Sequence, residues 1–208
     1  MNEYLSIGKD GKSEYEEKKS RFFGFAKPVT TEEEALNFLK KIKSEFPDAR
    51  HHVYGYVLRS QNTVRYSDDR EPQGTAGMPV LDTIRKRNLC DCIIVVVRYF
   101  GGTLLGTGGL VRAYGAAATQ AIDDAGIVAF SKYTYTDITV GYTEYQKLFP
   151  FISANKIEVT NQDFTDQVHL SICTKEADTA RFIEEMTELC YGRIAFCEEK
   201  TIFECKNL

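Results

Sequence analysis

Hydrophobic and polar positions in the first half of the chain follow helical and strand periods in turn. Apolar residues from Ala35 to Phe46 recur at helical intervals behind Thr31 and Glu34, which have capping-box spacing. This pattern predicts a helix that ends at Pro47. The segment before it, Tyr15 to Val29, mixes charged residues with phenylalanines and predicts one strand that enters a turn.

Three further segments predict the centre of a sheet. His52 to Leu58 and Thr63 to Tyr66 are rich in β-forming residues and flank the turn-like stretch 60–62, so we expect a hairpin. Cys92 to Val97 is continuously apolar and β-branched. Such a run is typical of a central strand that is covered on both faces.

Two helices are predicted around that central strand. Residues 68–77 hold charges, a proline and two glycines without an apolar period, which indicates a loop, and a helix follows from Pro79. Apolar positions from Leu110 to Ala125 predict the second helix. Its small residues Gly115 to Ala118 allow a close approach, so we expect this helix to lie tight against the sheet.

The pattern restarts near Ser131, which predicts a second domain. Strands alternate there with helices in the order β-α-β-β-α-β, which is the order of a ferredoxin-like sandwich. The predicted elements are 133–140, 143–155, 158–163, 167–173, 177–190 and 193–205. The sequence therefore predicts an α+β protein of two domains, with boundaries 1–130 and 131–208.

Composition supports an ordinary globular protein. Of 208 residues, 43% are hydrophobic and 27% are charged, which argues against disorder. The longest apolar run is Ile93 to Val97, far short of the roughly 20 residues that a bilayer requires. The N-terminal residues lack the basic and apolar regions of a signal peptide. We therefore expect a cytoplasmic protein with no membrane partner.

The net charge of −4 hides an asymmetry between the two parts. Residues 1–130 carry 18 basic and 17 acidic residues, whereas residues 131–208 carry 8 and 13. Within the first part, residues 50–112 hold nine basic and five acidic residues. A polyanion should therefore meet the N-terminal domain.

The six cysteines predict neither a disulfide framework nor a metal site. The chain is long enough to build a core without covalent cross-links, and it shows no export signal. Cys90 and Cys92 are spaced C-x-C, and no second close pair or nearby histidine completes a tetrahedral zinc site. The cysteines fall in strand and helix patterns that suit buried, inert thiols, and we expect no metal and no cofactor.

A glycine-rich run between Arg98 and Arg112 is the main candidate for binding chemistry. Glycines let a partner approach the backbone, and a helix N-terminus offers unpaired N–H donors and a partial positive charge, so the run favours anions. A Walker loop is excluded because Leu110 follows Gly109, and a dinucleotide fingerprint is excluded by Val111. The alternative is that the glycines serve only a tight turn and close helix packing.

A second cluster offers acid–base chemistry. Asp68, Asp69 and Glu71 follow His51 and His52 in the sequence, and such groups can bind a metal or transfer protons. Many solvated loops have the same composition. No G-x-S-x-G elbow is present, and we expect no catalytic residues.

These motifs resemble those of the IMPACT family, in its bacterial, YigZ-like branch. The matching segments are 49–52, 67–69, 71–72, 74–79, 95–102 and 105–115. Arg70 stands where glycine is usual in the family, and Val53 stands where cysteine is common. The resemblance covers the N-terminal domain closely and extends to a smaller ferredoxin-like domain.

The resemblance implies a fold and a function. The N-terminal domain should share the ribosomal-protein-like α/β superfold of domain IV of elongation factor G, with a rare left-handed crossover, and the C-terminal domain should be similar to the last domain of that factor. Eukaryotic relatives are implicated in restraining the amino-acid-starvation kinase through its ribosome-associated activator. RNA or the ribosome is thus the expected partner, with a translation-factor protein as the alternative.

Two hypotheses follow. The first is a translation-linked regulatory protein that binds RNA or the ribosome through the glycine-rich run. The second is a small-molecule hydrolase or transferase that acts on a phosphorylated substrate, with His51, Asp68 or Glu71 as acid or base, and it requires these groups to meet at one pocket. The residues expected to bind an anion or nucleic acid are His51, Arg65, Asp69, Glu71, Thr75, Arg98, Tyr99, Gly101, Gly102, Gly106, Gly108, Gly109 and Arg112.

Overall fold

The computed structural model describes residues 3–205, which divide into two compact units, Tyr4–Ala129 and a second formed mainly by residues 130–205. Within that range no helix combines the length and the apolar character that crossing a bilayer demands. The elements of the first unit are β1 (Glu3–Ile7), β2 (Gly11–Glu17), β3 (Ser20–Pro28), α1 (Glu32–Glu45), β4 (His51–Leu58), a 3-10 turn (Ser60–Asn62), β5 (Thr63–Ser67), α2 (Gly77–Lys86), β6 (Cys92–Tyr99) and α3 (Gly106–Ala125).

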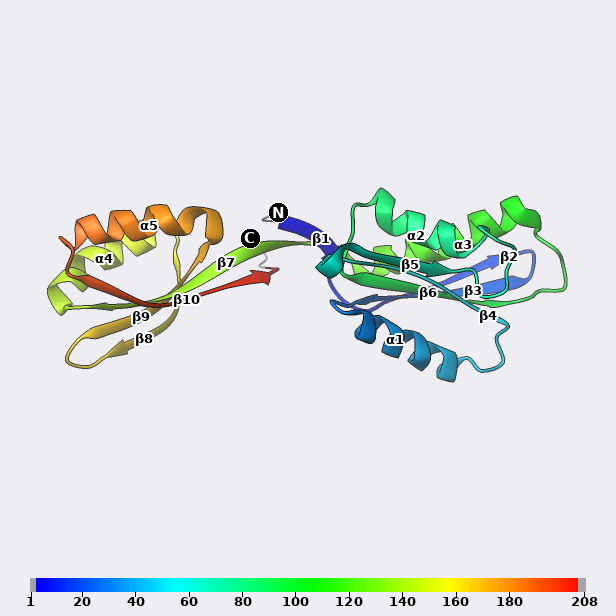
Figure 1. The fold of residues 1–208 in the computed structure, drawn as a ribbon, viewed down its shortest axis with the longest axis horizontal. Helices are drawn as coiled ribbons and strands as arrows, with labels where there is room; N and C mark the ends of the chain where they lie inside the picture. Colours follow the sequence, from blue (N-terminus) through cyan, green and yellow to red (C-terminus); the bar gives the residue numbers. More distant parts are fainter. Residues whose placement is uncertain (1–2, 206–208) are drawn as a thin grey trace. The chain divides into compact units, whose positions relative to one another are not determined.

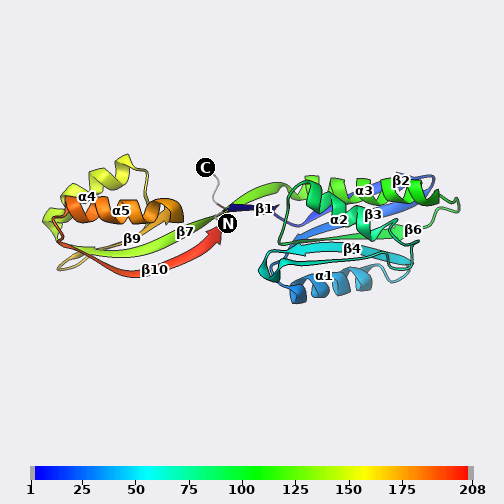
Figure 2. The ribbon, with the colours of Figure 1, turned by 45° about the horizontal axis from the view of Figure 1, so that its top comes forward.

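The sheet of the first unit is antiparallel and has the order β2-β3-β6-β4-β5. Helix α1 covers one face, and α2 and α3 cover the other (Figures 1 and 2). The predicted central strand is confirmed, because β6 lies in the middle and its residues Cys92 to Val97 are fully buried. Its side chains alternate between the two cores: Ile94 and Val96 face α3, whereas Val95 and Val97 face α1.

Close contact between α3 and the sheet accounts for the buried alanines Ala117 and Ala118, whereas Gly115 lines the groove beside α2. The Ser13 hydroxyl donates to the Ala117 carbonyl at 2.7 Å, so the backbones of β2 and α3 nearly touch. A Cβ added at Gly24 would lie 2.7 Å from the same carbonyl oxygen. The helix therefore positions its N-terminal end firmly over the sheet.

The sequence pattern merges two strands that the structure separates. The predicted strand 15–29 is a hairpin of β2 and β3, whose turn residues Lys18 and Lys19 have φ of 48° and 65°. Two-residue hairpin turns need positive φ and usually recruit glycine or asparagine. Lysines in these positions give no turn signal, which is why a single strand was expected. Strand β1 was not predicted.

The second unit has the expected order of elements. They are β7 (Ile127–Val140), α4 (Tyr142–Ala154), β8 (Glu158–Phe164), β9 (Val168–Lys175), α5 (Glu176–Leu189) and β10 (Ile194–Glu204). The strands lie in the order β10-β7-β9-β8, and α4 and α5 pack on one face of this sheet (Figure 1). Its core is built around Leu148, Leu170 and Met186.

Candidate anion-binding site

The strand register brings two candidate residues together. His51 on β4 lies directly opposite Arg98 on β6, and opposite residues of an antiparallel pair point to the same face. Phe22, also opposite Arg98, belongs to the core under α3, so Arg98 and His51 lie on the α2–α3 side. Tyr99 points to the other face, where its ring meets Phe23 in a T-shaped contact.

Glu71 is the centre of a buried polar cluster. Its carboxylate accepts from Arg98 Nη1 at 2.6 Å and from the Tyr114 hydroxyl at 2.8 Å. The side chains of Glu71 and Arg98 are 4% and 7% exposed. Burial, followed by the negative charge of Glu71, raises the pKa of Tyr114, which keeps its hydroxyl a donor. The acidic loop is thereby fixed to both β6 and α3.

His51 presents one ring nitrogen to this cluster. Its Nδ1 lies 2.8 Å from the Asp69 carbonyl, and its Nε2 lies 3.9 Å from Glu71 Oε1. A neutral ring that donates through Nδ1 has a lone pair on Nε2. His51 thus turns Nε2 toward Glu71, whose carboxylate is engaged by two other donors. Neighbouring His52 is buried, which lowers its pKa, and its ring contacts the Phe46 carbonyl at 3.0 Å.

Two aspartates build the acidic loop. Asp68 accepts the backbone N–H groups of Gly74, Ala76 and Gly77 and so satisfies donors at the start of α2. Asp69 Oδ2 accepts the His52 amide at 2.6 Å. The carboxylates of both aspartates thus hold the loop in place.

The glycine run contributes both a loop and the first turn of a helix. Helix α3 begins at Gly106, four residues before the predicted start at Leu110. The sequence pattern missed this first turn because glycine has a low helix propensity. Gly102 and Gly106 have φ of 84° and 72°, which suits glycine. The Gly101 amide donates to Ser20 Oγ at 3.1 Å. Within the described residues, the amides of residues 102–105 have no hydrogen-bond acceptor.

These groups surround one cavity of about 490 Å³, which we call the glycine-loop pocket. The pocket joins the acidic loop, β4, β6 and the start of α3, all within the first unit. Its lining residues are Arg50, His51, Glu71, Pro72, Arg98, Phe100, Leu104, Leu105, Gly106, Thr107 and Leu110. His51, Glu71, Arg98 and Gly106 were candidates from the sequence, and they meet here.

Other candidates lie elsewhere. Arg65 is opposite Tyr56, whose side chain packs in the core under α1, so both Arg65 and Tyr99 face away from the pocket. Thr75 is buried and its hydroxyl donates to the Pro72 carbonyl. Arg112 is exposed and lines a separate groove between α2 and α3. Gly108 and Gly109 belong to the first turn of α3 but do not line the pocket.

The leucines of the pocket wall and Tyr114 were not among the predicted site residues. Leu104 and Leu105 lie inside the glycine run and carry no recognisable anion-binding signal. Leu104 is 83% exposed, and Phe100 is 50% exposed. The one available signal for Tyr114 was its place on α3, two turns after the glycines.

The cysteines are all free, as expected from a chain without a disulfide framework. Burial raises the pKa of the Cys90 thiol to about 11, and Cys92 is buried. The expectation of buried thiols is wrong for Cys197 and Cys205, which are exposed, and Cys90 is only half-buried. Cys197 lies on the predicted strand, whereas Cys205 follows the end of β10.

Comparison with known proteins identifies the family of the chain. The Impact N-terminal domain matches residues 18–122, and a domain of unknown function (DUF1949) matches residues 138–193. The chain belongs to the IMPACT family. It is 34% identical to IMPACT family member YvyE of Bacillus subtilis over 93% of this chain and 89% of that one. It is 32% identical to IMPACT family member YigZ of Escherichia coli over 85% and 88%.

A solved structure is similar to this IMPACT-family chain along its length. That crystal structure, of a hypothetical protein, has a TM-score of 0.62 and 30% sequence identity, and the match covers 96% of this chain and all of that one. The backbone of the acidic loop explains why glycine, and not arginine, is expected at position 70. Arg70 has a φ of 71°, a left-handed conformation that favours the glycine expected from the family pattern. Its guanidinium donates to the Arg50 carbonyl at 2.7 Å, which helps to hold the loop in this conformation.

Proposed function

We propose that this chain is a regulatory binding protein of the translation apparatus, which associates in the cytoplasm with RNA or the ribosome. The observation that carries the proposal is the set of unpaired amides at residues 102–105, next to the N-terminus of α3. Backbone N–H groups at a helix start bind phosphate oxygens without regard to sequence. A translation-factor protein with an acidic surface is the alternative partner.

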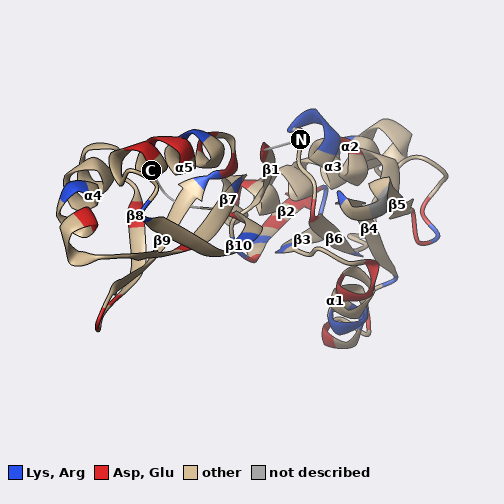
Figure 3. Ribbon diagram, turned by 60° about the vertical axis from the view of Figure 1, so that its left-hand side comes forward, with Lys and Arg blue, Asp and Glu red and all other residues tan. Residues whose placement is uncertain are grey.

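The charge distribution supports contact through the first unit. Acidic side chains mark α5 in the second unit, whose sequence holds Glu176, Asp178, Glu184, Glu185 and Glu188 and one basic residue, Arg181 (Figure 3). A polyanion is repelled from such a surface. In the first unit, Arg85 and Lys86 lie in the last turn of α2.

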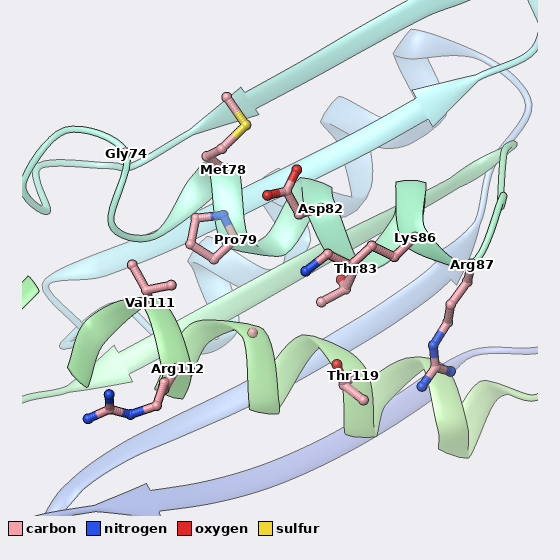
Figure 4. Close-up of a pocket in the computed structure, with 11 residues that line it drawn as sticks. Gly74, Met78, Pro79, Asp82, Thr83, Lys86, Arg87, Val111, Arg112 and Thr119 are labelled. Atoms are coloured by element: carbon pink, nitrogen blue, oxygen red, sulfur yellow. The ribbon is translucent and has the colours of Figure 1, made fainter. Parts of the chain in front are cut away.

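The groove between α2 and α3 extends the proposed contact along α3. It has a volume of about 420 Å³, and its rim carries Lys86, Arg87 and Arg112 (Figure 4). Arg87 pairs with Asp123, whereas the exposed Arg112 has no acidic partner among the described residues. A phosphate backbone that lies along the N-terminal half of α3 would meet the free amides first and Arg112 one turn later.

We also propose a superfold for each of the two units. The first unit would share the superfold of domain IV of elongation factor G. The strand order β10-β7-β9-β8 of the second unit supports a ferredoxin-like sandwich.

Co-sedimentation with ribosomes over a salt series tests the proposal. Association should weaken steeply between about 50 and 200 mM salt, and Arg112→Ala should reduce the slope of log affinity against log salt by about 1. Arg98 is unsuited to this test because its charge is buried against Glu71. Arg181→Ala, on exposed α5, is the matched control and should leave the slope unchanged.

Salt-independent association, or equal slopes for the two variants, would contradict the proposal. Crosslinked pull-downs from cells with and without nuclease separate the partners. Loss of the captured material after nuclease indicates RNA, and retention indicates a protein partner.

The convergence of His51, Glu71 and Arg98 on one pocket favours a second candidate function. It is a hydrolase or transferase that acts on a phosphorylated compound, with His51 Nε2 as the proton acceptor. Release of nitrophenol from para-nitrophenyl phosphate measures it. If His51 is the general base, His51→Gln should lower kcat by about 10²- to 10⁴-fold. Absence of turnover by the wild-type protein removes this candidate.

A further inference from the structure

The glycine-loop pocket combines one polar end with an apolar wall. The polar groups are His51, Glu71 and Arg98, together with the first turn of α3. Phe100 and Leu104 supply apolar surface to the same pocket, and both are at least half exposed. A few fixed polar groups beside an apolar surface are typical of sites for small molecules.

Arg98 supplies a buried donor that the protein itself leaves unused. Its Nη1 is paired with Glu71, but its Nε is buried and has no hydrogen-bond partner among the described residues. A buried polar atom without a partner costs about 1–3 kcal/mol, so such atoms are rare unless a ligand satisfies them. The guanidinium lies 5.7 Å from the Phe100 ring centre, which helps to fix its plane.

The helix start gives the same pocket a second set of donors. Gly106 and Thr107 line the pocket, and they belong to the first turn of α3, whose N–H groups have no partner within the helix. The positive end of the helix dipole adds to the field of these groups. Because Glu71 neutralises Arg98, the donors and the dipole together favour a single anionic group rather than a cation.

We infer that the glycine-loop pocket binds a small phosphate monoester that carries an apolar or aromatic group. The phosphate is held by the amides of Gly106 and Thr107 and by Arg98, and the apolar group lies against Phe100 and Leu104. A cavity of about 490 Å³ accommodates one ring with its phosphate. This ligand goes beyond the RNA or ribosome of the proposed function, and it shares the first turn of α3 with that partner.

Binding to the full chain is tested with three probes: phenyl phosphate, inorganic phosphate and phenol. Calorimetry gives the affinities, and nuclear magnetic resonance of ¹⁵N-labelled protein locates the site. We expect phenyl phosphate to bind at least 10-fold more tightly than either fragment and to shift the amides of residues 102–108. Equal affinities for phenyl phosphate and inorganic phosphate, or shifts elsewhere only, would overturn the inference.

Two variants at one exposed position isolate the backbone donors. Thr107→Pro removes one N–H in the first turn of α3, where proline is tolerated, and the preceding Gly106 has no Cβ to clash with the ring. Thr107→Ala keeps the N–H and is the matched control. We expect the loss of phenyl phosphate affinity to be at least 10-fold greater for Thr107→Pro than for Thr107→Ala.

A third variant keeps the inference testable if Thr107→Pro fails to fold. Arg98→Lys retains the positive charge beside Glu71 but has no atom equivalent to Nε, so it too should weaken phenyl phosphate binding at least 10-fold. Wild-type affinity of folded Thr107→Pro or of folded Arg98→Lys for phenyl phosphate would overturn the inference. These titrations contain no RNA, so they test the pocket ligand separately from the proposed function. If phenyl phosphate binds but the chain does not associate with ribosomes, only the proposed function is contradicted. If the chain associates with ribosomes but does not bind phenyl phosphate, only the pocket ligand is contradicted.

Discussion

Replacing Glu71 with alanine is expected to lower the free energy of unfolding by about 3–5 kcal/mol. The variant leaves the Arg98 guanidinium buried without its counter-charge and removes the acceptor of the Tyr114 hydroxyl. It also releases the acidic loop from β6 and α3. Urea unfolding, followed by circular dichroism, measures the loss.

Two further variants show whether the buried charge is the cause. Glu71→Gln keeps a carbonyl acceptor for Tyr114 and should lose less than Glu71→Ala. The double variant Glu71→Ala with Arg98→Met removes both charges, and its loss should be smaller than the sum of the single losses. A loss below about 1 kcal/mol for Glu71→Ala would mean that the pair behaves as a solvated surface ion pair.

Gly101→Ala is expected to destabilise the first unit by about 3 kcal/mol. The added Cβ would lie 2.0 Å from the carbonyl carbon of Lys19 and 2.2 Å from the amide nitrogen of Ser20. Both atoms belong to the backbone of the β2–β3 turn, so no side-chain rotation relieves the clash. Thermal and urea unfolding of the purified variant measure the effect.

Gly102→Ala is the neighbouring control. Its φ of 84° strains any other residue, but a Cβ there would meet no atom within 4 Å. The expected loss is about 1–2 kcal/mol, the cost of the left-handed conformation alone. Equal losses at the two positions would show that the turn moves away from residue 101 and that the close approach is not required.

Local signals predicted the elements that depend on local chemistry. The capping box formed by Thr31 and Glu34 is present, and α1 begins at the next residue after Thr31. The continuous apolar run of β6 correctly indicated a strand buried on both faces. The β2–β3 turn was missed because two lysines adopt positive φ there, and only the pairing of the flanking strands requires it.

The candidate site was predicted as a set of residues and not as a geometry. His51 and Arg98 are 47 positions apart, and the register of β4 against β6 places them opposite each other. The period of a strand already separates Arg98 from Tyr99, so the sequence held enough information to assign these neighbours to opposite faces. The pairing of Arg98 with Glu71 depends on the path of the acidic loop, which no local pattern gives.

The position of β6 between β3 and β4 has a consequence for synthesis. Strand β6 follows both hairpins in the sequence, and it pairs with β3 on one side and with β4 on the other. Before residues 92–99 are synthesised, neither β3 nor β4 has its second partner strand. The two inner edges of this sheet can therefore be closed only late in synthesis, and an open strand edge is prone to pair with other chains.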